Sequence, residues 1–177
     1  MSATGGAADA QAVRDTAGPR ARPTASSAGV SQRMAAQARR DTGPEMAIRR
    51  RLFAVGFRYR VNYRVAGLGR CSVDIAFPAR RVAVFVDGCF WHACPRHGSV
   101  PAANGTWWRD KLRANRRRDR AVTRLLRREG WTVLRFWEHD DPDAAVAEIA
   151  RTLAGPADTR KVGRKSAVTR AGGGGGR

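Results

Sequence analysis

Two short runs of apolar, β-branched residues joined by a tight turn constrain the fold of this chain more than any other feature. Residues 71–77 and 81–87 are rich in Val, Ile and Phe, and Pro78-Ala79-Arg80 separates them. This pattern predicts a β-hairpin. The second run is apolar without interruption from Val82 to Val86, so we expect its strand to lie at the centre of a sheet.

The periodicity of the flanking segments predicts the other elements. A capping-box pattern at Thr42 and Glu45, with Pro44 between them, predicts a helix to about residue 55. Strict alternation predicts a strand over residues 57–65, followed by a turn at residues 67–69. A long helix is expected from a Thr106 cap to about residue 129, then a strand over 131–137 and a helix from Pro142 to about residue 153. The predicted fold is α/β, with the order α-β-β-β-α-β-α and a mixed central sheet flanked by helices.

Composition divides the 177-residue chain into one domain and two tails. Residues 1–30 are rich in Ala, Gly, Ser, Thr and Pro, and residues 155–177 are basic and end in a glycine run, so both are expected to be disordered. Residues 31–154 form the predicted domain. No apolar run approaches the roughly 20 residues that span a bilayer, and no secretory signal is apparent, which predicts a cytoplasmic protein with no membrane partner.

The formal net charge of +19 indicates a polyanionic partner, with nucleic acid as the first expectation. Only three of the 34 basic residues are Lys, a bias that genomic base composition alone can produce. Residues 41–154 nevertheless carry 22 basic and 12 acidic residues, a net charge of +10. Solvated Arg-rich helix faces are the alternative interpretation.

Cysteine and histidine residues cluster after the central strand. Cys89, His92, Cys94 and His97 fall within nine residues, and His139 follows the 131–137 strand. Sulfur and imidazole ligands at this density predict a tetrahedral zinc site. Spacing alone favours the four clustered residues and leaves His139 out, so it does not settle whether His92 or His139 completes the site. Cys71 is interpreted as a small residue buried on its strand.

Three carboxylates lie at the ends of elements next to that loop: Glu45, Asp74 and Asp87. Carboxylates that converge at a sheet edge repel each other unless a divalent cation such as Mg²⁺ neutralises them, and such an arrangement is typical of phosphodiester cleavage. Each also has a structural interpretation. Glu45 fits a capping box, Asp87 an Asp-Gly turn, and Asp74 a local salt bridge.

The long helix has a face that is apolar at both ends and polar in the middle. Asn115 and Asp119 occupy the polar positions, at helical spacing from Trp108 and Leu126. They are expected either to anchor neighbouring loops or to face a wet site, because an unpaired buried polar group costs about 1–3 kcal/mol.

Taken together, residues from about 33 to 140 resemble the very short patch repair endonucleases. The most specific part of the resemblance is Gly88-Cys89-Phe90-Trp91-His92. The supporting stretches are Asp41-Thr42 with Glu45, Val73-Asp74, Val84 to Asp87, Trp108 to Arg120, and Gly130-Trp131 to Glu138. The resemblance implies a restriction-endonuclease-like fold and an enzyme that nicks one strand of DNA 5′ to the T of a T:G mismatch.

The resemblance also implies roles for individual residues. Asp74 would bind Mg²⁺ together with the Val86 carbonyl, His92 would act as general base or acid, and Glu45 would assist. Asp87 stands where the family prototype has His, so it is expected to bind or orient the metal. The residues implied to contact DNA are Phe90, Trp91 and Trp108, which would wedge into the duplex, together with Asn115 and Arg116.

In the zinc site, the resemblance assigns Cys89, Cys94, His97 and His139 as ligands and removes His92 from the metal shell. The ligand spacing departs from the family, which has a His-x-Cys pair where this chain has Cys94 and His97. The implied partner is double-stranded DNA with a T:G mismatch, bound by a monomer in the bacterial nucleoid. Two alternatives remain: a non-catalytic zinc-bearing DNA-binding domain, and a related nuclease with another DNA target.

Overall fold

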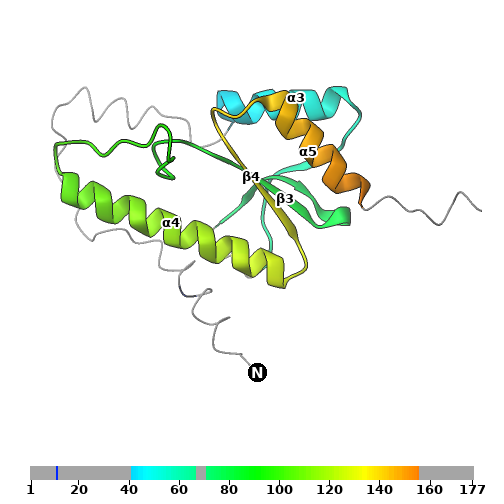
Figure 1. Cartoon of the computed structure of the whole chain (residues 1–177). Helices are drawn as coiled ribbons and strands as arrows, with labels where there is room; N and C mark the ends of the chain where they lie inside the picture. The colour runs from blue at the N-terminus through cyan, green and yellow to red at the C-terminus, as the bar shows by residue number, and fades with distance from the viewer. Residues whose placement is uncertain (1–10, 12–40, 67–70, 156–177) are drawn as a thin grey trace, which may run out of the picture.

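The computed structural model describes residues 11, 41–66 and 71–155, and its elements follow the predicted order (Figure 1). The predicted start of the domain at residue 31, the turn at 67–69, and nearly all of the tails at 1–30 and 155–177 lie outside these residues. The helices and strands are α3 (Gly43–Ala54), β1 (Arg60–Tyr63), β2 (Val73–Phe77), the 3₁₀ turn η1 (Pro78–Arg80), β3 (Val82–Asp87), α4 (Gly105–Arg128), β4 (Thr132–Trp137) and α5 (Pro142–Ala154).

The four strands form one mixed sheet in the order β1-β2-β3-β4. β1 and β3 are each antiparallel to β2, and Ile75 lies opposite Val84 in the predicted hairpin. β4 is parallel to β3, with Asp87 opposite Trp137 at their ends. The prediction that the 81–87 strand is central is confirmed, because it pairs on both sides. α4 provides the crossover that a parallel pair requires.

Helices cover both faces of the sheet, so the central strands are buried on both sides (Figure 1). Val82 and Val84 of β3 pack into a core with Leu52 of α3 and Ile149 of α5. The alternate residues Ala83 and Phe85 pack with residues of α4. The predicted α/β fold is confirmed, with α3 and α5 on one face of the sheet and α4 on the other.

Local differences from the sequence predictions have identifiable causes. The strand predicted over 57–65 is only Arg60–Tyr63, an edge strand in which Asn62 has a positive φ of 48°. The capping box is not formed, because the Thr42 side chain makes no capping bond and Glu45 instead accepts from the Asp41 amide. α4 begins at Gly105 rather than at a Thr106 cap.

None of the helices in the described ranges is long and apolar enough to cross a membrane.

Candidate active site and metal centre

The parallel pairing of β3 with β4 brings two distant segments to one edge of the sheet. Asp87 and Trp137 are partners at the ends of these strands, so Cys89 and His139, each two residues further on, emerge side by side. The Glu138 amide donates to the Asp87 carbonyl at 2.9 Å, and the Cys89 amide donates to Glu138 Oε1 at 2.7 Å. These bonds fix the start of the loop against the end of β4.

Four side chains converge here as a candidate metal centre: Cys89, Cys94, His97 and His139, with ligand atoms that all lie within 4.8 Å of one another. The two Nδ1 atoms are 3.3 Å apart, and Cys89 Sγ lies 3.0 Å from His139 Nδ1 and 3.7 Å from His97 Nδ1. Zinc bond lengths in a tetrahedron give about 3.3 Å between two nitrogens and about 3.6 Å between nitrogen and sulfur. The donor set therefore fits zinc in chemistry and in spacing.

Neighbouring groups orient one of these ligands and keep another protonated while the site holds no metal. His139 Nε2 lies 3.6 Å from Asp140 Oδ1, the kind of contact that orients a metal-binding imidazole through its other nitrogen. Burial, reinforced by Cys94 and Glu138, raises the pKa of the Cys89 thiol to about 12 in the metal-free protein. Metal binding at this site must therefore displace a proton from sulfur.

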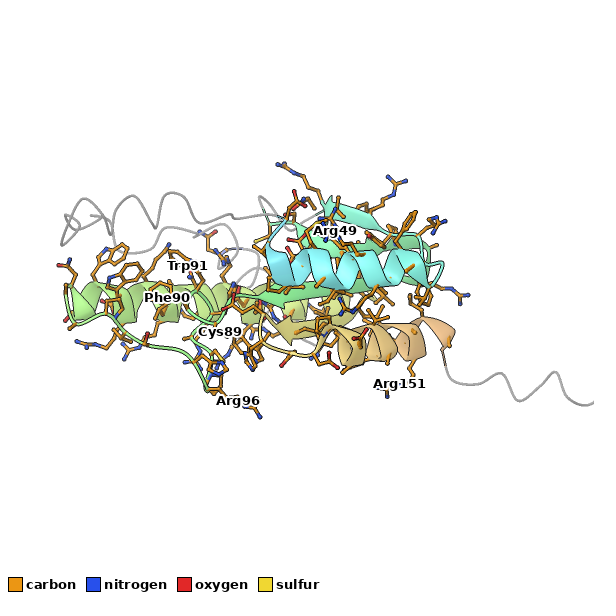
Figure 2. The ribbon with its side chains drawn as sticks, turned by 90° about the horizontal axis from the view of Figure 1, so that it is seen from above. Arg49, Cys89, Phe90, Trp91, Arg96 and Arg151 are labelled. Atoms are coloured by element: carbon orange, nitrogen blue, oxygen red, sulfur yellow. The ribbon has the colours of Figure 1, made fainter. Side chains whose placement is uncertain are left out.

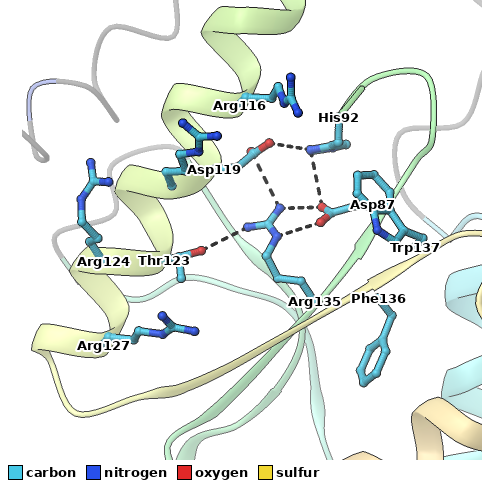
Figure 3. Close-up of a pocket in the computed structure, with 11 residues that line it drawn as sticks. Asp87, His92, Arg116, Asp119, Thr123, Arg124, Arg127, Arg135, Phe136 and Trp137 are labelled. Carbon is cyan, nitrogen blue, oxygen red and sulfur yellow. Dashed lines mark hydrogen bonds and ion pairs between the residues drawn. The ribbon is translucent and has the colours of Figure 1, made fainter. Parts of the chain in front are cut away.

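His92 is not a member of this cluster, and its imidazole faces α4 instead (Figure 3). Its Nδ1 lies 2.6 Å from Asp119 Oδ2 and 3.5 Å from Asp87 Oδ1. A carboxylate acceptor at Nδ1 favours the tautomer that carries its proton there, which leaves the Nε2 lone pair free. This is the arrangement expected of a general base.

Arg135 of β4 holds the two carboxylates in place (Figure 3). Its Nε and Nη2 bind the two oxygens of Asp87 at 2.7 and 2.5 Å, and Nη2 lies 3.8 Å from Asp119. The guanidinium also stacks over the Phe85 ring, 4.8 Å from its centroid. Both oxygens of Asp87 are thus occupied by Arg135, so in this structure the Asp87 carboxylate neighbours His92 as half of an ion pair.

The charges of this network favour an ionised Asp119. Burial opposes ionisation, but the His92 hydrogen bond, the charge that His92 carries when protonated, and the positive charges of Arg135 and Arg118 outweigh it and lower the pKa of Asp119. Burial likewise opposes the charge of Arg135, and Asp87 and Asp119 outweigh it and raise its pKa. Asp119 is therefore an acceptor, and His92 Nδ1 the donor, in their hydrogen bond.

Asp74 and Glu45 form a second carboxylate group. Asp74 Oδ2 accepts from the Val86 amide at 2.9 Å, and burial, together with the charges of Glu45 and Asp87, raises the pKa of Asp74 to about 6. Among the described residues, no ion pair engages Asp74, so the salt-bridge interpretation has no support there. Because the N–H and C=O of a strand residue point toward the same neighbouring strand, the Val86 carbonyl is also directed toward β2, the strand that carries Asp74. Two oxygens and excess negative charge fit a magnesium ion.

Glu45 is buried, with a relative exposure of 5%, and both of its oxygens have partners. Oε2 accepts from the Asp41 amide at 3.0 Å, and Oε1 lies 3.2 Å from Arg49 Nη1. Asp41 reaches back to Arg49 and closes this group. Glu45 is thus held rigidly where its charge acts on Asp74.

The predicted wedge residues form a contiguous aromatic cluster. The Phe90 ring lies 5.1 Å from Trp91 and 5.2 Å from Trp108, and Trp107 packs on Trp108 at 4.8 Å. Figure 2 shows Phe90 and Trp91 beside the first half of α4, away from Arg49 and Arg151 on the other helices. All four rings are half-buried, and together they form an apolar cluster between the loop and the start of α4.

Asn115 of α4 anchors the loop that carries this cluster. It is buried at 7% exposure, and its Nδ2 donates to the Trp91 carbonyl at 2.9 Å. This is the loop-anchoring role that its position on the polar helix face allowed. Direct contact of Asn115 with DNA stays a prediction, whereas Arg116 is exposed on the adjacent surface.

Sequence reasoning missed the functional pairings of three residues. Asp119 was identified only as a polar residue on an apolar face, and its partner His92 could not be named. Arg135 gave no signal beyond a charge within an apolar strand, which is itself unusual. Glu138 was noted only as part of a motif, and its bond to the Cys89 amide spans 49 residues.

Comparison with known proteins agrees with this geometry. Residues 25–96 match the family model described as DNA mismatch endonuclease Vsr. The chain is 47% identical over 133 residues to the Type II nicking enzyme V.NaeI of Lentzea aerocolonigenes, covering 74% of this chain and 80% of that protein. It is 38% identical over 112 residues to the Type II nicking enzyme V.XorIIP of Xanthomonas oryzae, covering 62% of this chain and 79% of that protein.

A further relative is the DNA mismatch endonuclease Vsr of Escherichia coli K12, 36% identical over 120 residues, which cover 61% of this chain and 68% of that protein. The family-model match contains Asp74, Cys89, His92 and Cys94, whereas His97 and His139 lie after it. The similarity to V.NaeI extends over most of both proteins. The chain belongs to the Vsr family of DNA endonucleases and is a hydrolase of phosphodiester bonds.

Proposed function

We propose that the protein is a Mg²⁺-dependent endonuclease, stabilised by zinc, that nicks one strand of duplex DNA 5′ to the T of a T:G mismatch. The observation that supports this most directly is the His92 imidazole, oriented by Asp119 through Nδ1 and separated from the zinc ligands. Asp87 connects it to the magnesium site, because Asp87 lies 3.5 Å from His92 and its charge acts on Asp74.

In the proposed reaction, water attacks the phosphorus and transfers its proton to His92 Nε2. The 3′-oxygen leaves with the bond's electron pair and takes up a proton from solvent, which gives 3′-hydroxyl and 5′-phosphate ends. Asp74 and the Val86 carbonyl would hold the magnesium ion, whose charge would neutralise negative charge on the phosphate. Asp119 stabilises the imidazolium that forms on His92, and Glu45 adds negative charge that strengthens cation binding at Asp74.

The aromatic cluster gives a physical basis for mismatch selectivity. Stacking of a base on an aromatic ring contributes about 1–3 kcal/mol. Opening a base step costs a few kcal/mol in paired DNA and less at a mismatch. Insertion of Phe90, Trp91 and Trp108 is therefore favoured at a mispaired step.

Zinc at Cys89, Cys94, His97 and His139 would hold the loop that carries both the aromatic cluster and His92. The same proposal includes action as a monomer in the bacterial cytoplasm. A non-catalytic DNA-binding domain would account for the basic surface and the metal centre but not for the His92–Asp119 pair.

A nicking assay tests the proposal. One duplex with a T:G mismatch and the same duplex with T:A are labelled on each strand and incubated with and without Mg²⁺. We expect cleavage of the T strand only, in the mismatched duplex and with Mg²⁺. Equal cleavage of both duplexes would indicate a related nuclease with another target, and binding without cleavage would indicate the non-catalytic alternative.

A further inference from the structure

A pocket of about 370 Å³ lies between α4 and β4, beside the His92 network (Figure 3). Five arginines line it, against the two carboxylates Asp87 and Asp119. Arg135 is bound to Asp87 and belongs to the network already described. The other four arginines come from α4, so the pocket carries an excess of positive charge that the catalytic groups do not use.

All four of these α4 arginines are exposed. Arg116, Arg120 and Arg127 share one face of α4, because their spacings of four and seven match the helical repeat. No carboxylate among the described residues forms an ion pair with any of them. Like charges one turn apart on a helix repel each other. An anion bound along this face would relieve that repulsion.

We propose that this arginine face of α4 binds phosphate groups of the DNA backbone outside the cleaved bond. The proposal rests on duplex DNA being the substrate of the proposed function. The three guanidiniums extend over about 16 Å of helix, long enough to contact several phosphates of one strand. Arg116 lies at the end of the row next to His92, and Arg127 lies further along α4 (Figure 3). A strand whose scissile phosphate reached His92 would therefore extend along the row into the flanking duplex.

Backbone contacts of this kind have a defined signature. They position a duplex but do not read its sequence, so their loss weakens binding equally for all sequences. Each phosphate contact also contributes about 0.9 to the slope of log affinity against log salt. The face therefore contributes salt-dependent affinity, while the aromatic cluster contributes the preference for mismatched DNA.

The test uses the full chain with Arg116, Arg120 and Arg127 all changed to Ala. Affinities for matched and mismatched duplexes are measured by fluorescence anisotropy over a series of salt concentrations. We expect the slope to fall by roughly 2 to 3, and both affinities to fall by the same factor. Lys at the same three positions should restore the slope, because a point charge still displaces counterions.

The matched control changes the exposed residues Arg50, Arg80 and Arg151 to Ala, which removes the same charge from elsewhere on the surface. An unchanged slope in the α4 variant, or an equal loss in the control, would overturn the proposal. These slopes can be measured even if the wild type fails to nick a T:G duplex, so failure of the proposed function stays distinguishable.

A second source of phosphate is a free anion. Calorimetric titration of the wild type with inorganic phosphate at constant ionic strength distinguishes a site for free phosphate from a site for the DNA backbone. We expect no saturable binding of free phosphate. Saturable binding that the Ala variant loses, with its DNA slope unchanged, would identify a site for free phosphate and refute the backbone contact.

Discussion

The ionised carboxylate of Asp74 should make the folded protein less stable at neutral pH. Burial, followed by the charges of Glu45 and Asp87, raises the pKa of Asp74 to about 6, although the Val86 amide donates to it. The unfolded chain has an Asp pKa of about 3.9. The folded protein therefore binds this proton more tightly than the unfolded chain does. The contribution of Asp74 to the free energy of unfolding is most favourable below about pH 4 and is lost as the pH rises to about 6.

Asp74→Asn removes the charge and keeps the shape, and its amide oxygen can still accept from Val86. The shift of about two pKa units corresponds to about 3 kcal/mol at pH 8 and about 1.5 kcal/mol at pH 5. In the absence of divalent cations, the variant should be more stable than the wild type by these amounts. Nicking activity should be lost at the same time.

Urea unfolding of both proteins at pH 5 and pH 8, with equal zinc content, measures the difference. Asp110→Asn is the control, because Asp110 is exposed on α4 and its side chain is 52% accessible. Added Mg²⁺ should raise the stability of the wild type and of this control but not of Asp74→Asn. A variant that is no more stable than the wild type at pH 8, or a gain that does not change with pH, would refute the electrostatic argument.

Three further predictions concern the other parts of the site. His92→Ala should lower the nicking rate by about 10²- to 10⁴-fold while zinc content, measured by atomic absorption, is retained; a fall in zinc would place His92 in the metal shell. Gly98→Ala should reduce the affinity for zinc, measured by competition titration with a chelator, because the added Cβ would lie 2.4 Å from the Cys94 carbonyl oxygen. Gly43→Ala is the control: its added Cβ meets nothing within 4 Å, so this variant should bind zinc normally. Arg135→Leu should destabilise the protein by about 3–5 kcal/mol in denaturant unfolding, because the buried Asp87 would lose both of its close hydrogen bonds and keep only the His92 imidazole, 3.5 Å away. Unfolding free energies that match the wild type would show that this ion pair has little net effect on stability.

Local patterns in the sequence were sufficient for the order and type of the elements. The β-branched runs around Pro78-Ala79-Arg80 form the predicted hairpin, and the uninterrupted run Val82–Val86 lies inside the sheet. These features depend on periodicity and turn chemistry within a few residues. The 57–65 strand was predicted too long: the alternation of residue types covers nine residues, but only Arg60–Tyr63 pair with β2, and Asn62 within them has a positive φ.

The candidate site could be predicted only in part. Resemblance to a known family separated His92 from the zinc ligands, whereas the spacing of Cys and His residues did not. The bond between His92 and Asp119 spans 27 residues, and the pair of Asp87 with Arg135 spans 48. The sequence spacing of these residues does not predict either pair, because each contact depends on how α4 packs on the sheet and how β4 pairs with β3.

The sequence by itself determined the residue types available for chemistry and the elements that carry them. Tertiary structure decided which of these residues meet. The parallel register of β3 with β4 places His139 beside Cys89 and leaves His92 to turn toward Asp119 on α4. The physical reason is that helix and strand patterns depend on neighbours along the chain, whereas the ligands of a metal and the partner of a base are selected by packing between segments far apart in the chain.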